Sequence, residues 1–166
     1  MNKGLVVVAS LLVLILVSGC GERMTEEQLY AKVLDYEEKQ QWEDLADTYE
    51  QLVKQYPDSP KAADHLYNLG MVYANNLKEY EKAIDMWQRL LKEHGDSDIA
   101  TKTEFLIGYC YANNIKDFDM ARQKYSEFLE NHPDHVLAPS VQWELEHLGQ
   151  DIDSMTFEVE DETATN

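Results

Sequence analysis

The sequence predicts an all-α fold: a short right-handed solenoid of three helix pairs, closed by one further helix at the C-terminal end. Two observations predict it. The passage from Tyr73 to Ala83 recurs 38 residues later, from Tyr111 to Ala121, and both copies begin Tyr-Ala-Asn-Asn. Around both copies, apolar residues recur at helical spacing. Repetition at a fixed period is typical of arrays in which each unit packs only on its neighbours.

A third unit becomes visible when the offset is continued towards the N-terminus. Four apolar positions, spaced i, i+7, i+10 and i+11, are then shared by all three units and lie on one stripe of a helix. They are Trp42, Tyr80 and Phe118; Tyr49, Trp87 and Tyr125; Leu52, Leu90 and Phe128; and Val53, Leu91 and Leu129. This stripe belongs to the second helix of each unit.

The first 19 residues are predicted to be a signal peptide. Lys3 is followed by an apolar run from Leu5 to Val17, which is shorter than the ~20 residues that a membrane-spanning helix needs. The alternative, a retained anchor helix, is disfavoured by this length.

The signal ends in Val17-Ser18-Gly19-Cys20, which resembles the lipobox of bacterial lipoproteins. The resemblance implies cleavage before Cys20, acylation of its thiol, and a linker over residues 20–24. Two or three acyl chains hold a protein stably at a bilayer. Gly21 in place of Asp after the cysteine resembles the sorting signal for the outer membrane in enteric bacteria. We therefore expect a lipid-anchored protein of the bacterial cell envelope, at the outer membrane and facing the periplasm.

The composition is strongly acidic, with 14 basic and 32 acidic residues and a net charge of −18. Nucleic acid is therefore not expected as a partner, because binding phosphates needs clustered Lys and Arg. Such acidity is ordinarily a solvated surface, and attraction to a basic partner or to divalent cations is the alternative. Cys110 is the only cysteine beyond Cys20, so no internal disulfide is expected.

The helices follow from these signals. First helices are predicted over 25–39, 60–76 and 97–114, second helices over 41–55, 79–93 and 117–130, and a seventh helix over 138–149. Thr25 and Gln28 form a capping box at the start. Each second helix is stopped by a Pro or a Gly, and the Asp and Ser residues that follow are suited to cap the next helix.

Two further features complete the array. Gly70 and Gly108 recur inside the first helices, where a glycine costs about 1 kcal/mol against alanine, so we expect two helices to approach closely there. The seventh helix stops at Gly149 and has no partner, so it is predicted to cover the last pair's apolar side. Residues 150–166 hold six acidic and no basic residues, which predicts a disordered tail.

These units resemble the tetratricopeptide repeat over residues 25–149. The family pattern of Leu-Gly, Tyr, Ala, an aromatic residue and Pro is matched by Leu69, Gly70, Tyr73, Ala83, Trp87 and Gly95, and by Ile107, Gly108, Tyr111, Ala121, Tyr125 and Pro133. The first unit departs from it at Lys32, Asp35 and Leu45. Units longer than the family's period of about 34 residues resemble its envelope branch, which includes the barrel-assembly lipoprotein called the D subunit and the periplasmic coordinator of the Tol-Pal system.

The sequence predicts neither an enzyme nor a metal or cofactor site. His132, Asp134 and His135 are close together, but His132 occupies a slot that holds a ring side chain in all three units. A specific metal site needs three or four converging ligands. Cys110 is predicted to be a small buried apolar side chain. No phosphate loop, nucleophile elbow or paired-carboxylate motif is present in the sequence.

The family resemblance implies that first helices line the face that contacts a partner. Transferred to this sequence, the resemblance implies the following partner-contact residues: Asp64, Asn68, Met71 and Asn75, then Lys102, Tyr109 and Asn113, and from the last helix Trp143, Glu144 and His147. Amide side chains suit an extended peptide backbone, and aromatic rings suit its side chains. Alternatively, Tyr67, Phe105 and Trp143, which recur at constant spacing, are packing residues.

Acidic C-terminal tails are disfavoured as ligands. The carboxylate clamp of chaperone-binding relatives requires Lys and Arg on successive first helices. Here only Lys102 is present, with Leu106 where an Arg would be needed.

We therefore predict a lipid-anchored envelope scaffold that binds a protein or peptide partner, in outer-membrane protein assembly or in cell-envelope maintenance. The alternative is a lipoprotein that captures a small molecule or a glycan. The identity of the partner and the oligomeric state stay open.

Overall fold

The structure, a computed structural model, describes residues 23–150, and this part of the chain is helical with no strand. Its helices are α1 (Glu26–Glu38), α2 (Trp42–Gln55), α3 (Ala62–Val72), α4 (Tyr80–His94), α5 (Ala100–Cys110), α6 (Phe118–Asn131) and α7 (Ala138–Glu146). The predicted signal peptide, the predicted lipidation site Cys20 and the predicted tail from residue 151 onward lie outside the described residues. No described helix has the length and apolar character needed to cross a membrane.

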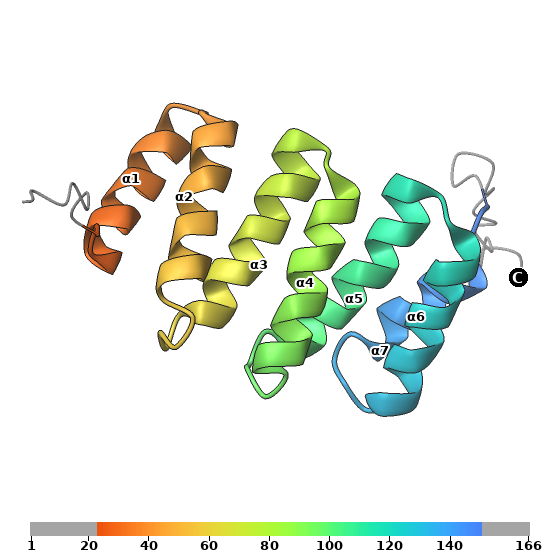
Figure 1. Cartoon of the computed structure of the whole chain (residues 1–166). Helices are drawn as coiled ribbons and strands as arrows, with labels where there is room; N and C mark the ends of the chain where they lie inside the picture. Colours follow the sequence, from red (N-terminus) through yellow and green to blue (C-terminus); the bar gives the residue numbers. More distant parts are fainter. Residues whose placement is uncertain (1–22, 151–166) are drawn as a thin grey trace, which may run out of the picture.

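The helices pack in chain order, each against the one before and the one after. Figure 1 shows the antiparallel helix pairs in a single row, with α1 at one end and α7 packed on α6 at the other. The predicted fold, three helix pairs and a closing helix, is confirmed. The second helices begin and end within one residue of their predicted bounds.

The start of the array has the predicted capping box. The Thr25 N–H donates to Oε1 of Gln28 at 2.8 Å, and the Gln28 N–H donates to Oγ1 of Thr25 at 3.2 Å. Two backbone donors that the first helical turn leaves free are thereby satisfied.

The predicted caps between the units are wrong. We expected an Asp or Ser such as Ser97 to cap the next helix, but α3, α5 and α7 have no side-chain cap. Ser97 instead lies between two consecutive turns, in which its N–H donates to the His94 carbonyl and its carbonyl accepts from Ala100, both at 3.0 Å. Because the turns use backbone bonds, the predicted start at residue 97 moves to Ala100. The last helix is also shorter than predicted and ends at Glu146.

The duplicated Tyr-Ala-Asn-Asn passage forms the turn inside the second and third units. In both copies the α-helix widens into a single π-helical turn, η1 (Tyr73–Leu77) and η2 (Tyr111–Ile115). The Tyr73 carbonyl accepts from Lys78 and, at 2.9 Å, from Glu79. A π-turn holds one more residue than an α-turn, so it accounts for one of the residues by which these units exceed the family's period of about 34.

A left-handed residue follows each of these turns. It is Lys78 at φ 61° in the second unit and Lys116 at φ 65° in the third. Gln40, 38 residues before Lys78, has φ 54°. All three units therefore share the backbone reversal, although the first lacks the Tyr-Ala-Asn-Asn signature.

The two glycines mark close helix contacts, as predicted. A Cβ added at Gly70 would lie 2.6 Å from Cδ1 of Trp87, and one added at Gly108 would lie 2.7 Å from Cε1 of Tyr125. Both rings come from the second helix of the same unit. Glycine is thus needed because an aromatic ring occupies the space of its missing side chain.

The core consists of two clusters of buried side chains. One extends from α1 to α5, and the other joins α6 to α7. Val141 of α7 is fully buried against α6, so α7 covers the last pair as predicted. At the opposite end, Leu34 of α1 is 66% exposed, whereas Val72 and Cys110 at the same repeat position are buried.

Candidate functional site

The ten predicted contact residues lie in rows along the first helices. The rows are Asp64, Asn68 and Met71 on α3 with Asn75 on η1; Lys102 and Tyr109 on α5 with Asn113 on η2; and Trp143 and Glu144 on α7 with His147 at its C-terminal end. None of the ten is buried. Residues 38 apart, such as Met71 and Tyr109, occupy the same register, so their side chains repeat from unit to unit.

Four of these residues meet in one hollow at the end of the array. Asn113, Trp143, Glu144 and His147 line a groove of about 460 Å³ between the η2 turn and α7. We call it the C-terminal groove. Its other lining residues are Ala112, Lys116, Phe118, Leu148, Gly149 and Gln150.

The wall of the C-terminal groove on α7 is a fixed aromatic pair. The rings of Trp143 and His147 stack with centroids 4.4 Å apart and planes 21° from parallel. Nδ1 of His147 donates to the Trp143 carbonyl at 2.8 Å, which sets the orientation of the imidazole. Trp143 remains 42% exposed and Phe118 39% exposed. The groove therefore offers two accessible aromatic surfaces, of which at least one is already ordered.

A buried phenol, that of Tyr125, lies near Glu144 of this groove. Tyr125 is fully buried, and burial, followed by the nearby carboxylate of Glu144, raises its pKa well above the ordinary value. Its hydroxyl makes no hydrogen bond of normal geometry in the described part of the chain, although the Glu144 carboxylate lies close to it. Tyr125 therefore stays neutral and contributes packing, not acid–base chemistry.

Three more predicted residues meet in a second, smaller hollow at the other end. Asn68, Met71 and Asn75 line a groove of about 130 Å³ together with Glu37, Trp42, Leu45, Tyr49, Val72 and Asn76. We call it the N-terminal groove. Burial, followed by the charge of Glu37, raises the pKa of Tyr49 to about 12, so its hydroxyl stays protonated.

The two grooves occupy equivalent places in the repeat. Trp42 of the N-terminal groove and Phe118 of the C-terminal groove are the same position of their units, as are Met71 and His147. Each groove lies between the turn of one unit and the first helix that follows. The array thus repeats one kind of hollow along the predicted face.

Three predicted residues line neither groove. Asp64 is exposed on α3. The Lys102 ammonium lies 5.2 Å from the centroid of the Tyr67 ring, a cation–π contact, and Tyr109 packs beside Phe105 with centroids 6.0 Å apart. These residues lie on the face between the grooves.

The alternative interpretation, that Tyr67, Phe105 and Trp143 are packing residues, holds for two of the three. Tyr67 and Phe105 are partly buried and pack against the core clusters, and Phe105 also stacks on Tyr125 at 6.2 Å. Trp143 differs because, within residues 23–150, no further unit follows α7 to cover it.

Sequence reasoning missed two apolar residues of the C-terminal groove, Phe118 and Leu148. Phe118 was assigned to the packing stripe of the second helices. A signal was available: this stripe position begins the second helix directly after the turn, so it lies at the edge of the repeat.

Nothing among the described residues suggests a reaction centre. No group of three His, Cys, Asp or Glu residues could hold a metal ion in the described range. His132 instead pairs with Glu104, Nε2 to Oε2 at 2.9 Å. Cys110 is 2% exposed, as predicted for a small apolar side chain, and burial raises the pKa of its thiol to about 11. Such a thiol is a poor nucleophile near neutral pH.

Comparison with protein families matches the tetratricopeptide repeat three times, over residues 29–59, 66–97 and 103–135, which together exceed half of the chain. The chain belongs to the tetratricopeptide-repeat family. The matches follow the three helix pairs and include the first unit, whose sequence departs most from the pattern. Comparison with curated proteins finds none that matches. Tetratricopeptide repeats are protein-interaction scaffolds and typically non-catalytic, so protein binding is the general function of this array.

Proposed function

We propose that this tetratricopeptide-repeat protein is a lipid-anchored scaffold of the bacterial cell envelope, which binds a protein or peptide partner along its first-helix face. The partner would act in outer-membrane protein assembly or in envelope maintenance. The C-terminal groove carries this proposal, because it combines the family's binding face with exposed aromatic side chains.

The groove suits a peptide segment for three reasons. Exposed Trp143 and Phe118 offer the large apolar contacts that dominate binding energy at protein interfaces. Asn113 and Glu144 on the same walls supply polar groups for a peptide backbone. The stack of Trp143 on His147 fixes the ring before binding, which lowers the entropy lost on association.

The anchor is supported by the sequence alone. Val17-Ser18-Gly19-Cys20 after an apolar run has the order and spacing of a lipobox. Only four residues separate Cys20 from the cap residue Thr25, so an anchored chain would hold the N-terminal end of the array close to the membrane. The C-terminal groove would then lie at the end of the helix array that is farthest from the anchor.

The anchor is tested by fractionation. Cys20→Ser should move the protein from the membrane fraction to the soluble fraction of cells that express it. Sedimentation of Cys20→Ser with membranes in the same proportion as the unchanged protein would contradict the lipoprotein proposal.

The binding face is tested by crosslinking in cells with Trp143→Ala and Tyr109→Ala. Both variants should lose a crosslinked partner that the unchanged protein retains, because both remove exposed aromatic area from the first-helix face. An exposed second-helix residue such as Asp85 serves as the matched control, and Asp85→Ala should retain the partner. Unchanged crosslinking by both aromatic variants would contradict the assignment of this face.

One observation favours the second candidate, capture of a small molecule or glycan. The volume of the C-terminal groove, about 460 Å³, lies within the range of small-molecule sites. A thermal-shift screen of the purified protein against peptidoglycan fragments and small solutes separates the two. The scaffold proposal predicts no shift, whereas a shift that Trp143→Ala abolishes would favour ligand capture.

A further inference from the structure

A third groove lies where the second and third units meet, and none of the predicted contact residues lines it. It has a volume of about 240 Å³ and is built by α4, α5 and α6. We call it the inter-unit groove. Its lining residues are Gln88, Leu91, Glu104, Ile107, Lys124, Glu127 and Asn131.

The repeat itself provides the comparison that makes this groove unusual. At the junction one unit earlier, the positions of Glu104 and Lys124 are held by Leu66 and Met86. Leu66 is buried at 2% exposure and belongs to the core, whereas the side chain of Glu104 is 31% exposed. Two charged residues therefore replace two apolar ones at a packing position of the array.

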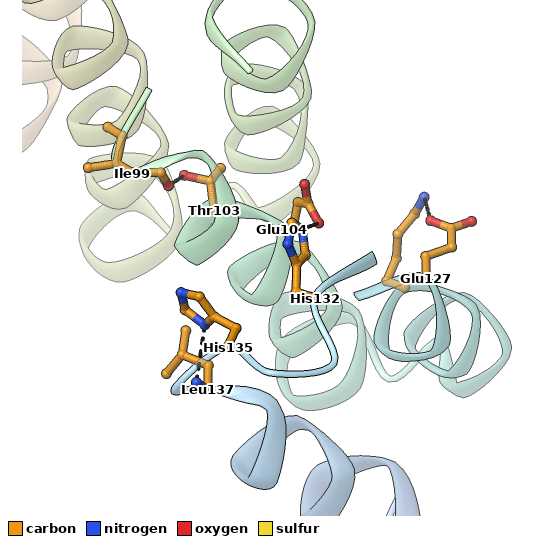
Figure 2. A network of polar contacts seen from close by, with 8 residues as sticks. Ile99, Thr103, Glu104, Glu127, His132, His135 and Leu137 are labelled. Atoms are coloured by element: carbon orange, nitrogen blue, oxygen red, sulfur yellow. Dashed lines mark hydrogen bonds and ion pairs between the residues drawn. The ribbon is translucent and has the colours of Figure 1, made fainter. Parts of the chain in front are cut away.

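Each charge has a partner within the molecule. Glu104 Oε2 lies 2.9 Å from His132 Nε2, and Lys124 Nζ lies 2.7 Å from Glu127 Oε2. Figure 2 shows Glu104 facing His132, with Glu127 and its own polar contact nearby. These pairs keep the charges satisfied, but partly buried pairs add little stability compared with well-packed apolar side chains.

Packing therefore does not account for these residues. The larger core cluster spans this junction through Leu90 of α4 and Ile107 of α5. Glu104 and Lys124 do not extend this cluster, and the chain has a groove at their positions.

The lining of the groove indicates what it binds. Leu91 and Ile107 form an apolar part. Both carboxylate oxygens of Glu127 are engaged, by Lys124 and by Gln123, so the carboxylate of Glu104 is the negative charge of the lining that Lys124 does not match. An arginine side chain has the matching parts, because its alkyl stem is apolar and its guanidinium fork pairs with carboxylates. Residues 151–166 are excluded as the occupant because they contain no basic residue.

We propose that the inter-unit groove receives an arginine side chain of the protein partner. This proposal rests on the scaffold function proposed above, and it places a second contact on residues separate from the first-helix face. The net charge of −18 favours a basic partner segment at long range, and the groove gives that segment one specific anchor.

The test is an NMR titration of the full-length, ¹⁵N-labelled protein in detergent with the peptide acetyl-Gly-Arg-Gly-amide. The amides of Ile107, Lys124 and Asn131 should shift in a saturable manner. The same peptide with citrulline, which has nearly the same shape but no charge, should bind about tenfold more weakly, as expected for loss of a charged hydrogen bond. Equal binding of both peptides would overturn the proposal.

The residues at the preceding junction, between the first and second units, suggest the variant to test. Glu104→Leu/Lys124→Met installs the side chains of Leu66 and Met86 and should abolish the shifts while raising the unfolding temperature. Glu43→Leu/Lys92→Met removes the same two charges from exposed positions and should bind as the unchanged protein does. Should the first double variant fail to fold, Glu104→Gln keeps the shape and should still weaken binding.

Two results contradict this proposal without contradicting the scaffold function. One is persistence of the shifts in Glu104→Leu/Lys124→Met. The other is a set of shifts confined to the first-helix face around Tyr109. Loss of the crosslinked partner from Tyr109→Ala tests the scaffold function separately.

Discussion

Replacing Gly108 with alanine should destabilise the protein, although alanine is ordinarily the better helix residue. The added Cβ would lie 2.7 Å from Cε1 and 2.8 Å from Cδ1 of Tyr125. Favourable carbon contacts are about 3.5–4.0 Å. Tyr125 is fully buried, so its ring cannot swing into solvent to make room.

The magnitude follows from two opposing terms. Alanine in a helix interior gains about 1 kcal/mol over glycine. Overpacking a dense core costs about 1–3 kcal/mol, and a clash with two atoms of a buried ring belongs at the upper end. We expect a net loss of about 1–2 kcal/mol in the free energy of unfolding, or roughly 4 °C in Tm for each kcal/mol in a domain of this size.

Urea denaturation followed by circular dichroism measures this loss as a lower midpoint with an unchanged slope. Lys32 occupies the position of Gly108 in the first unit and is partly exposed, so Lys32→Ala should change stability by less than about 0.5 kcal/mol. Gly108→Ala combined with Tyr125→Leu should cost less than the sum of the single changes. If Gly108→Ala alone is as stable as the unchanged protein, the close-contact explanation is wrong.

Three further predictions concern stability. Lys116→Gly should raise the free energy of unfolding by about 0.5–1 kcal/mol, since φ is 65° there and only glycine adopts it without strain; a lower Tm would contradict this. Tyr125→Phe should be neutral or stabilising because its hydroxyl is unpaired, whereas Tyr73→Phe loses the bond to Glu50 and should cost about 1 kcal/mol; equal urea midpoints would refute the contrast. Burial lowers the pKa of His65, so the unfolded chain binds a proton more readily than the folded chain does. The contribution of His65 to stability is therefore complete above about pH 6.5 and falls below that pH by at most about 1.4 kcal/mol per pH unit. The urea midpoint of His65→Thr should change less with pH over this range than the midpoint of the unchanged protein.

The sequence predicted best those elements whose packing repeats. The second helices were placed within one residue because their apolar stripe is set by contact with the neighbouring helices, which is the same in every unit. The need for glycine at Gly108 was predicted for the same reason. The start of α5 was predicted less well. The linker before it, around Ser97, is held by backbone hydrogen bonds, which leave no side-chain pattern in the sequence.

The candidate site was predicted in part because it depends on where the repetition stops. In the described part of the chain no unit follows α7, so Trp143 and Phe118 are exposed, although both occupy positions that pack elsewhere in the array. The inter-unit groove was missed because Glu104 looks like an ordinary helical charge in the sequence. The repeat offset places it opposite Leu66, and the burial of Leu66 in the structure shows that this is a core position.

The central claim is that the first-helix face binds a protein partner, and site-specific photocrosslinking tests it most directly. A photoreactive amino acid in place of Tyr109 on α5 should give a discrete protein adduct in cells, and the same amino acid in place of Asp47, which is exposed on α2 and lines none of the three grooves, should not. Adducts from Asp47 alone, the same adducts from both positions, or none from Tyr109 would contradict the claim.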